Sequence, residues 1–328
     1  MIRKWLWLWL KKIGKNKSTA EGVVAISYRP DGIAIAISNF VENKKSSLKH
    51  CEFIPTLNVS DHPHILKDLV TRHHLADYDC HIVLTSNNYN HINIEAPAVP
   101  EYEIADAIHW KIVDLFDFPI EEAFVDYYFL PKSMRVTENK ILEVFACPKI
   151  FIQKLADKSS RSGLKVNVIE IQETALRNLA KFLPENKSGV ALLILDEFSG
   201  TILIQKEGTI YLSRNFHIGY GDLDLDRQHT SDYSQGKVAE GNLALEIQRS
   251  LDYVESYYGI APASGLAVIP LTRNTQELLT ILNNNLGINA KVIDISQLVS
   301  SDVVLNDAIQ SKCSGVIGAV LRQTESAL

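Results

Sequence analysis

The chain has 328 residues, more than one ordinary hydrophobic core organises, and this length suits two domains of α/β size. A hydrophobic content of 46% is ample for globular cores, and no segment has the composition of a disordered region. Four scattered cysteines without a CxxC pair argue against a disulfide framework or a structural zinc site, and the formal charge of −6 argues against a general nucleic-acid surface.

Residues 1–20 are a basic, tryptophan-rich segment. It holds three of the four tryptophans and six cations ahead of the first acid, Glu21; without these cations the formal charge falls from −6 to −12. The apolar run Trp5–Leu10 is too short to span a bilayer, but an amphipathic helix here would suit a membrane surface. We expect contact with anionic lipid or a partner protein, and packing on the protein's own surface is the alternative. The residues expected to make this contact are Trp5, Trp7, Trp9, Lys11 and Lys12.

Residues 21–89 are predicted to form the first part of a first domain. Two alternating strands flank Arg29–Gly32, whose Arg-Pro-Asp-Gly sequence is strong turn chemistry. A third strand over 48–54, a helix over 60–73 and a buried strand over 80–85 follow.

Four histidines of this part invite a metal-site interpretation: His62, His64, His73 and His74. Neither pair comes with carboxylate or thiolate ligands at the spacing that metal sites use. We therefore predict no metal site.

Residues 90–170 differ in organisation from the part before them, and we expect a subdomain inserted into the first domain, which continues at 171–186. A prolyl boundary at Pro97–Pro100 precedes a helix with apolar residues at three- and four-residue spacing. The expected elements alternate as helix, strand, strand, helix and strand, at 104–115, 123–130, 141–147, 148–163 and 165–169.

Residues 187–309 are predicted to form a second domain around a three-stranded meander. Strands over 191–195, 201–205 and 209–218 are joined by turns that both carry glycine. The helix that follows has one apolar face, which must pack on this sheet; its residues are Leu243, Ile247, Leu251, Val254 and Tyr258. Two further strands at 265–269 and 291–295 enclose a helix, and residues 310–328 end the chain in a helix expected to return to the first domain.

Four phrases of the sequence together resemble one family: IYLSRNFHIG (210–219), LEIQRSLDYVESYYG (245–259), FPIEEAFVDY (118–127) and GVIGAVLR (315–322). They are similar to PilM, the cytoplasmic actin-like protein of type IV pilus assembly, and to its relative MshI. The resemblance implies an α/β chain with the actin-like ATPase (ribonuclease H-like) fold: two related domains and an inserted subdomain of the FtsA/PilM type.

In this fold the phosphates of ATP are held by backbone N–H groups at two hairpin turns, with an aspartate in each ribbon near the magnesium ion. Carried onto this sequence, the resemblance places Asp196, Ser199, Gly219 and Gly221 near the phosphates. It places Glu246 and Arg249 near the ribose or base, and the alternative for these two is a solvated or interdomain ion pair.

The sequence departs from that pattern at three points. The aspartate of the first ribbon falls at Ala25 or Ser27, Phe198 stands where glycine is expected, and Pro270–Thr272 replaces paired glycines. We expect no catalytic residue and no meaningful turnover, and residual binding of ATP with magnesium stays open.

The resemblance also implies a function as a scaffold at the cytoplasmic face of the inner membrane. The expected partner is the cytoplasmic tail of a PilN-like membrane protein, in a groove beside the helix Glu103–Leu115, within a pilus assembly platform. Two alternatives remain open: an active ATPase or sugar-kinase-like enzyme, and an FtsA-like filament former.

Overall fold

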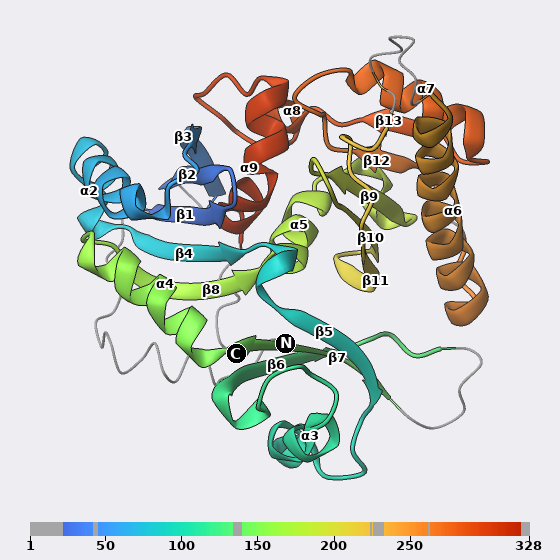
Figure 1. Ribbon diagram of the computed structural model, residues 1–328, viewed down its shortest axis with the longest axis horizontal. Helices are drawn as coiled ribbons and strands as arrows, with labels where there is room; N and C mark the ends of the chain where they lie inside the picture. The colour runs from blue at the N-terminus through green and yellow to red at the C-terminus, as the bar shows by residue number, and fades with distance from the viewer. Residues whose placement is uncertain are drawn as a thin grey trace. The chain divides into compact units, whose positions relative to one another are not determined.

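The computed structural model describes residues 22–41, 45–133, 140–223, 225, 233–261 and 263–322. They form two compact units: the first runs to Gln172 and the second continues from Glu173, with Ser133 assigned to the second. Each unit is built on a five-stranded mixed sheet, and the first also carries a three-stranded sheet (Figure 1).

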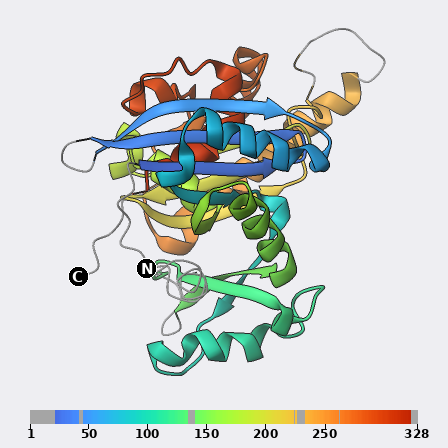
Figure 2. The same ribbon diagram turned by 90° about the vertical axis from the view of Figure 1, so that its left-hand side faces the viewer.

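The first sheet contains, in spatial order, β3 (Lys45–Pro55), β2 (Gly32–Val41), β1 (Gly22–Arg29), β4 (Asp79–Leu84) and β8 (Lys165–Ile171). Strands β3, β2 and β1 pair antiparallel with one another, whereas β4 is parallel to both of its neighbours, β1 and β8. Helices α2 (His62–Arg72) and α4 (Lys149–Arg161) share one core with this sheet, and Figure 2 looks onto the face that they cover. The predicted hairpin is confirmed, since β1 ends at Arg29 and β2 begins at Gly32.

The three-stranded sheet has the order β5 (Asn90–Glu95), β7 (Ile141–Pro148) and β6 (Ala123–Phe129), and helix α3 (Ile104–Ile112) packs on it. Three isoleucines of α3 are buried against this sheet: Ile104, Ile108 and Ile112. Leu115, expected on the same stripe, is 53% exposed because the helix ends at Ile112.

The inserted block is shorter than the expected residues 90–170. Strand β8 pairs with β4 in parallel, and α4 packs on the five-stranded sheet, so residues 149–171 belong to the first sheet. The assignment of these residues to the insertion was wrong, because local periodicity gives a helix and a strand but not the sheet that receives them. Along the chain, the three strands of the small sheet and helix α3 are therefore inserted between β4 and α4.

The second unit repeats the same strand order. Its sheet contains β11 (Thr209–Phe216), β10 (Gly200–Lys206), β9 (Val190–Leu195), β12 (Leu266–Val268) and β13 (Ala290–Val292). Helices α6 (Tyr233–Tyr258) and α7 (Thr275–Asn285) share its core. The expected apolar face of α6 is buried there, except that Leu251 is only partly buried. The meander, the long helix and the edge strand β13 are therefore confirmed.

Three further helices belong mainly to the second unit: α5 (Gln172–Ala180), α8 (Ile295–Leu298) and α9 (Asp307–Val320). Helix α9 lies very close to α5 at Gly318, where a Cβ atom would stand 2.1 Å from the carbonyl oxygen of Ala175. The side chain of Asn178 donates to the carbonyl oxygen of Gly318 at 3.3 Å, which ties the same two helices together.

Candidate functional site

The turn between β9 and β10 holds two of the residues expected near phosphates, Asp196 and Ser199. The turn closes on itself, because the backbone N–H of Asp196 donates to the carbonyl oxygen of Ser199 at 2.8 Å. Phe198 projects from the turn and is 69% exposed. An anion that approached the backbone here would meet this aromatic ring.

The loop after β11 packs directly on that turn and brings Gly219 and Gly221 to it. The N–H of Tyr220 donates to the carbonyl oxygen of Asp196 at 2.9 Å, and the N–H of Gly221 donates to that of Glu197 at 2.8 Å. A Cβ atom on Gly219 would lie 2.2 Å from the oxygen of Glu197, so only glycine permits this approach.

The N–H of Gly219 donates to the carboxylate of Asp222 at 2.8 Å. The structure thus assembles the four predicted residues, but it turns three consecutive backbone donors, those of 219–221, toward protein oxygens. A phosphate would have to displace these bonds.

Glu246 and Arg249 form an ion pair on α6. Arg249 Nη1 donates to Glu246 Oε1 at 3.3 Å, and Arg214 Nη1 on β11 lies 3.8 Å from Glu246 Oε2. For Glu246 and Arg249 the sequence left an ion pair open as the alternative to nucleotide contact, and such a pair is present within the second unit. Arg214 was missed, because its contact with a helix later in the chain leaves no local pattern in the sequence.

The first ribbon, formed by β1 and β2, has no carboxylate at residues 25 and 27, where an aspartate was expected. Ala25 is fully buried, and the hydroxyl of Ser27 donates to the carbonyl oxygen of Val83 at 3.0 Å. Tyr28, at the end of the strand, shares a hydrogen bond of 2.7 Å with the hydroxyl of Ser159 on α4. These side chains are committed to the core of the first unit.

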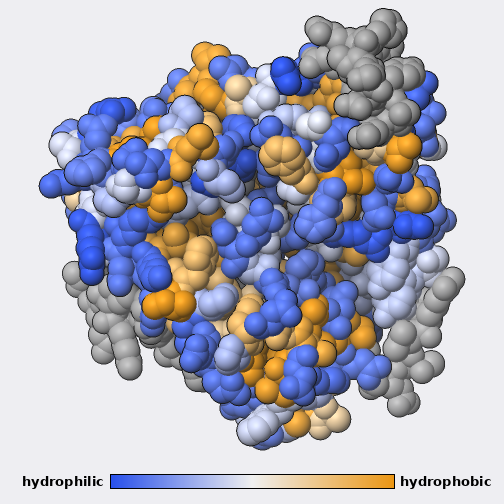
Figure 3. Space-filling model, in the orientation of Figure 1, coloured by the Kyte–Doolittle hydropathy of each residue, from blue (hydrophilic) through white to orange (hydrophobic). Residues whose placement is uncertain are grey.

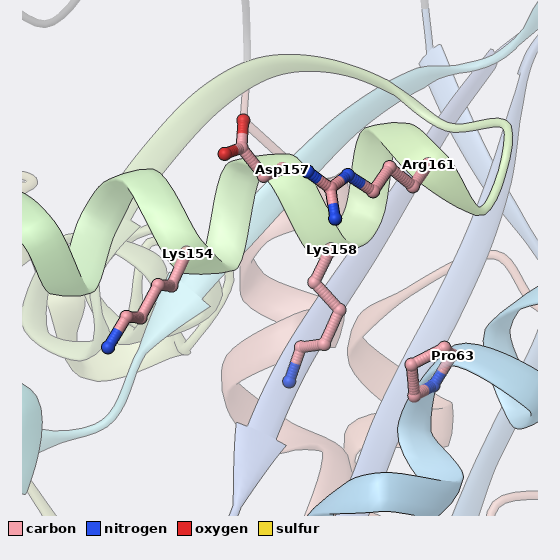
Figure 4. A pocket seen from close by; sticks show the side chains of 5 residues that line it. All are labelled: Pro63, Lys154, Asp157, Lys158 and Arg161. Atoms are coloured by element: carbon pink, nitrogen blue, oxygen red, sulfur yellow. The ribbon is translucent and has the colours of Figure 1, made fainter.

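A basic pocket of about 300 Å³ lies in the first unit beside α2 and α4; it is lined by Pro63, Lys154, Asp157, Lys158 and Arg161. Figure 4 shows Lys154 and Lys158 extending to one side of α4, with the Asp157 carboxylate on the other. Three cations around one carboxylate give the pocket the charge to hold a small carboxylate or phosphate group.

Lys158 is held by two aromatic groups. Its Nζ lies 3.1 Å from Nδ1 of His62 and 3.8 Å from the ring centre of Tyr28. Burial lowers the pKa of Lys158 to about 8, and burial followed by the charge of Lys158 lowers the pKa of His62. A neutral His62 ring therefore accepts a hydrogen bond from Lys158. His62 is one of the four histidines that were considered as metal ligands, and this bond uses its Nδ1 atom.

The outer surface of the inserted subdomain exposes large apolar side chains. Trp110 is 85% exposed, on the side of α3 opposite its buried isoleucines. Tyr102, in the turn before the helix, is 78% exposed, and Val113, directly after it, is 43% exposed. Figure 3 shows hydrophobic side chains gathered over this subdomain in the lower part of the view. Exposed patches of this kind mark interaction sites.

The structure does not describe the residues of the basic N-terminal segment, Trp5, Trp7, Trp9, Lys11 and Lys12. Among the residues that it does describe, we find no helix with the length and apolar character that a bilayer crossing requires.

No family model and no curated protein matches the sequence. Solved structures do match. One described as a PilM–PilN type IV pilus biogenesis complex superposes with a TM-score of 0.71 at 16% identity, over 92% of this chain and 98% of that chain. The cytoplasmic domain of EpsL, an inner-membrane component of the type II secretion system of Vibrio cholerae, matches with a TM-score of 0.50 at 11% identity, over 92% and 96%. The chain has the actin-like ATPase fold that the sequence predicted.

Proposed function

We propose that this chain is an actin-like scaffold of a type IV pilus assembly platform of the MSHA type, in the cytoplasm and peripheral at the inner membrane. The observation that carries the proposal is the agreement in fold with a PilM–PilN complex over 92% of the chain. A second, independent support is the resemblance of the phrase FPIEEAFVDY to PilM. This phrase spans residues 118–127 and includes most of β6 in the inserted subdomain.

The proposed partner is the short cytoplasmic tail of a PilN-like inner-membrane protein. The apolar outer face of α3 supports this choice, since a tail peptide needs an exposed aromatic anchor and Trp110 is the most exposed aromatic side chain of that face. The basic segment at residues 1–20 would add contact with anionic lipid and bring the scaffold to the membrane that holds its partner.

The proposed scaffold has a degenerate nucleotide site and no turnover. Support comes from the second unit, where the amides at 219–221 are bonded to protein oxygens and the exposed Phe198 projects from the turn. Support from the first unit is the absence of a carboxylate at Ala25 and Ser27, because magnesium would lose a ligand there. An active ATP-hydrolysing enzyme of the same superfamily is the alternative.

The test of the partner is calorimetric titration of the purified full chain with a synthetic peptide of the PilN-like cytoplasmic tail. We expect saturable one-to-one binding that Trp110→Ala weakens by about 2 kcal/mol, or roughly 30-fold in Kd. Phe198→Ala is the matched control, since it also removes an exposed aromatic ring but lies in the other unit.

Saturable binding that both variants leave unchanged would place the tail elsewhere on the protein. The absence of any heat at peptide concentrations near 1 mM, with a folded protein, would count against the PilN-like partner itself.

A further inference from the structure

Two polar residues stand on the helix-covered face of the edge strand β3. His50 pairs with Ile37 and Glu52 pairs with Ile35 across the sheet, and both isoleucines belong to the core under α2 and α4. The pairing is irregular at Lys49, and a bulge of this kind re-aims the neighbouring side chain. The strand therefore directs an imidazole and a carboxylate toward an aliphatic core.

A third polar residue reaches the same place from α2. His73 caps the C-terminus of this helix through its N–H to the carbonyl oxygen of Leu69, and its ring centre lies 4.2 Å from that of His50. One ligand atom from each of His50, Glu52 and His73 can be chosen so that all three lie within 4.8 Å of one another.

The two imidazoles are incompletely satisfied. Nε2 of His50 and Nε2 of His73 are both buried, and neither has a hydrogen-bond partner among the described residues. His50 Nε2 does lie 3.1 Å from Glu52 Oε1, but without the alignment of a hydrogen bond. Buried polar nitrogens without partners cost free energy, and a bound cation would satisfy both.

We propose that His50, Glu52 and His73 bind a divalent transition-metal ion of the zinc type. Two imidazole nitrogens and one carboxylate oxygen are a donor set that zinc accepts, whereas magnesium and calcium prefer oxygen ligands. The three atoms lie at most 4.8 Å apart, and small side-chain rotations would bring them to the separation of about 3.3 Å that tetrahedral zinc requires. The fourth position stays open to water or to a ligand from solution.

The charges around the three residues are balanced enough to admit a cation. Arg72 Nη1 lies 4.0 Å from Glu52 Oε1, but the same guanidinium is also paired with Asp68 one helical turn earlier. The bound ion would fasten the edge strand to the end of α2, a local structural role separate from partner binding.

The test uses the full chain without an affinity tag, because a polyhistidine tag would itself bind the probe. Titration with zinc chloride in the calorimeter is expected to show one equivalent bound, and the variants His50→Asn and His73→Asn should each weaken binding about tenfold or more. His64→Asn and His74→Asn are the matched controls: both side chains are exposed and outside the three-residue cluster, and Asn suits the positive φ of 52° at His74.

A second measurement guards against a variant that fails to fold. Cobalt(II) in place of zinc should give visible d–d absorption in the parent, and His73→Cys should keep that binding and add thiolate-to-cobalt charge transfer. Zinc binding that only the control variants reduce, or no binding at 100 μM zinc by a folded parent, would overturn the site.

Discussion

At the scale of single residues, the structure explains why the sequence alone could not identify the polar clusters of the first unit. The sequence grouped His62 and His73, with His64 and His74, as metal-site candidates of one stretch of the chain and favoured none of them. Tertiary structure separates them: His62 pairs with Lys158 on α4, and His73 joins His50 and Glu52 on β3. Each cluster joins residues more than 20 positions apart, and such pairs leave no local pattern in a single sequence.

Lys158 gives a pH prediction whose sign follows from burial. Its folded pKa is about 8, below the value near 10.4 of an unfolded lysine, so the unfolded chain binds more protons between these two values. The contribution of Lys158 to stability should therefore rise with pH above 8, and Lys158→Met should abolish this contribution and stabilise the protein at pH 7. Because the side chain is about half exposed, solvent screening reduces the size of the effect.

The measurement is the difference in urea midpoint between the parent and Lys158→Met, followed from pH 7.0 to 9.5. Burial raises the pKa of Tyr28 and of the thiols of Cys80 and Cys147, and these three groups lower stability as the pH rises above about 9. Because both proteins contain them, their contribution cancels in the difference. Lys154→Met, on the same helix and in the same pocket, is the control and should show no such pH-dependent difference from the parent. A difference between the parent and Lys158→Met that stays constant across this range would contradict the assignment to Lys158.

At the scale of secondary-structure elements, the sequence predicted most of the fold. Both hairpin meanders and the long helix α6 were found, because turn residues and apolar spacing are local signals. Strand β5 was not predicted, although its residues alternate in HINIE (91–95), since it follows the helical turn Ser86–Asn88 without a glycine to mark its start. The sheet that receives α4 and β8 also escaped prediction, because parallel pairing of β8 with β4 is a long-range contact.

The contact between α5 and α9 supplies a prediction on packing. Gly318→Ala would place a methyl group 2.1 Å from the carbonyl oxygen of Ala175, so the helices must separate or the carbonyl must shift. Overpacking of this kind costs about 1–3 kcal/mol, and we expect a loss of stability in that range by urea denaturation.

Gly241 in α6 provides the matched control. No atom outside its own helix lies within 4 Å of a Cβ placed there, so Gly241→Ala should instead stabilise the protein by about 0.5–1 kcal/mol through helix propensity. Equal effects from the two variants would mean that close approach at Gly318 contributes nothing.

At the scale of the whole molecule, the sequence and the solved structures agree on the actin-like fold. The loss of ATP binding and hydrolysis is still a prediction. Asp196, Ser199, Gly219 and Gly221, which the sequence grouped, do lie together at the turn between β9 and β10, and their role toward a phosphate stays a prediction. The sequence could not predict the direction of the amides at 219–221, because backbone orientation in a loop depends on the tertiary contacts that hold it.

For magnesium ATP we expect no calorimetric binding by the full chain at nucleotide concentrations up to 1 mM. Asp196→Ala should then change neither this result nor the stability. Micromolar binding by the parent that Asp196→Ala abolishes would show that the site still works, and would favour the ATPase alternative. Phosphate release measured alongside would separate binding from turnover.

The repeated strand order has a practical consequence for studies in living cells. In both halves a parallel strand leads into a helix and then into the next strand, as β4–α4–β8 and as β12–α7–β13. The first connection already accommodates a whole folded insert without altering the strand order around it. The second is short and exposed at Thr272, Arg273 and Asn274. A fluorescent reporter spliced between Thr272 and Arg273 would occupy the equivalent place and leave both ends of the chain unmodified.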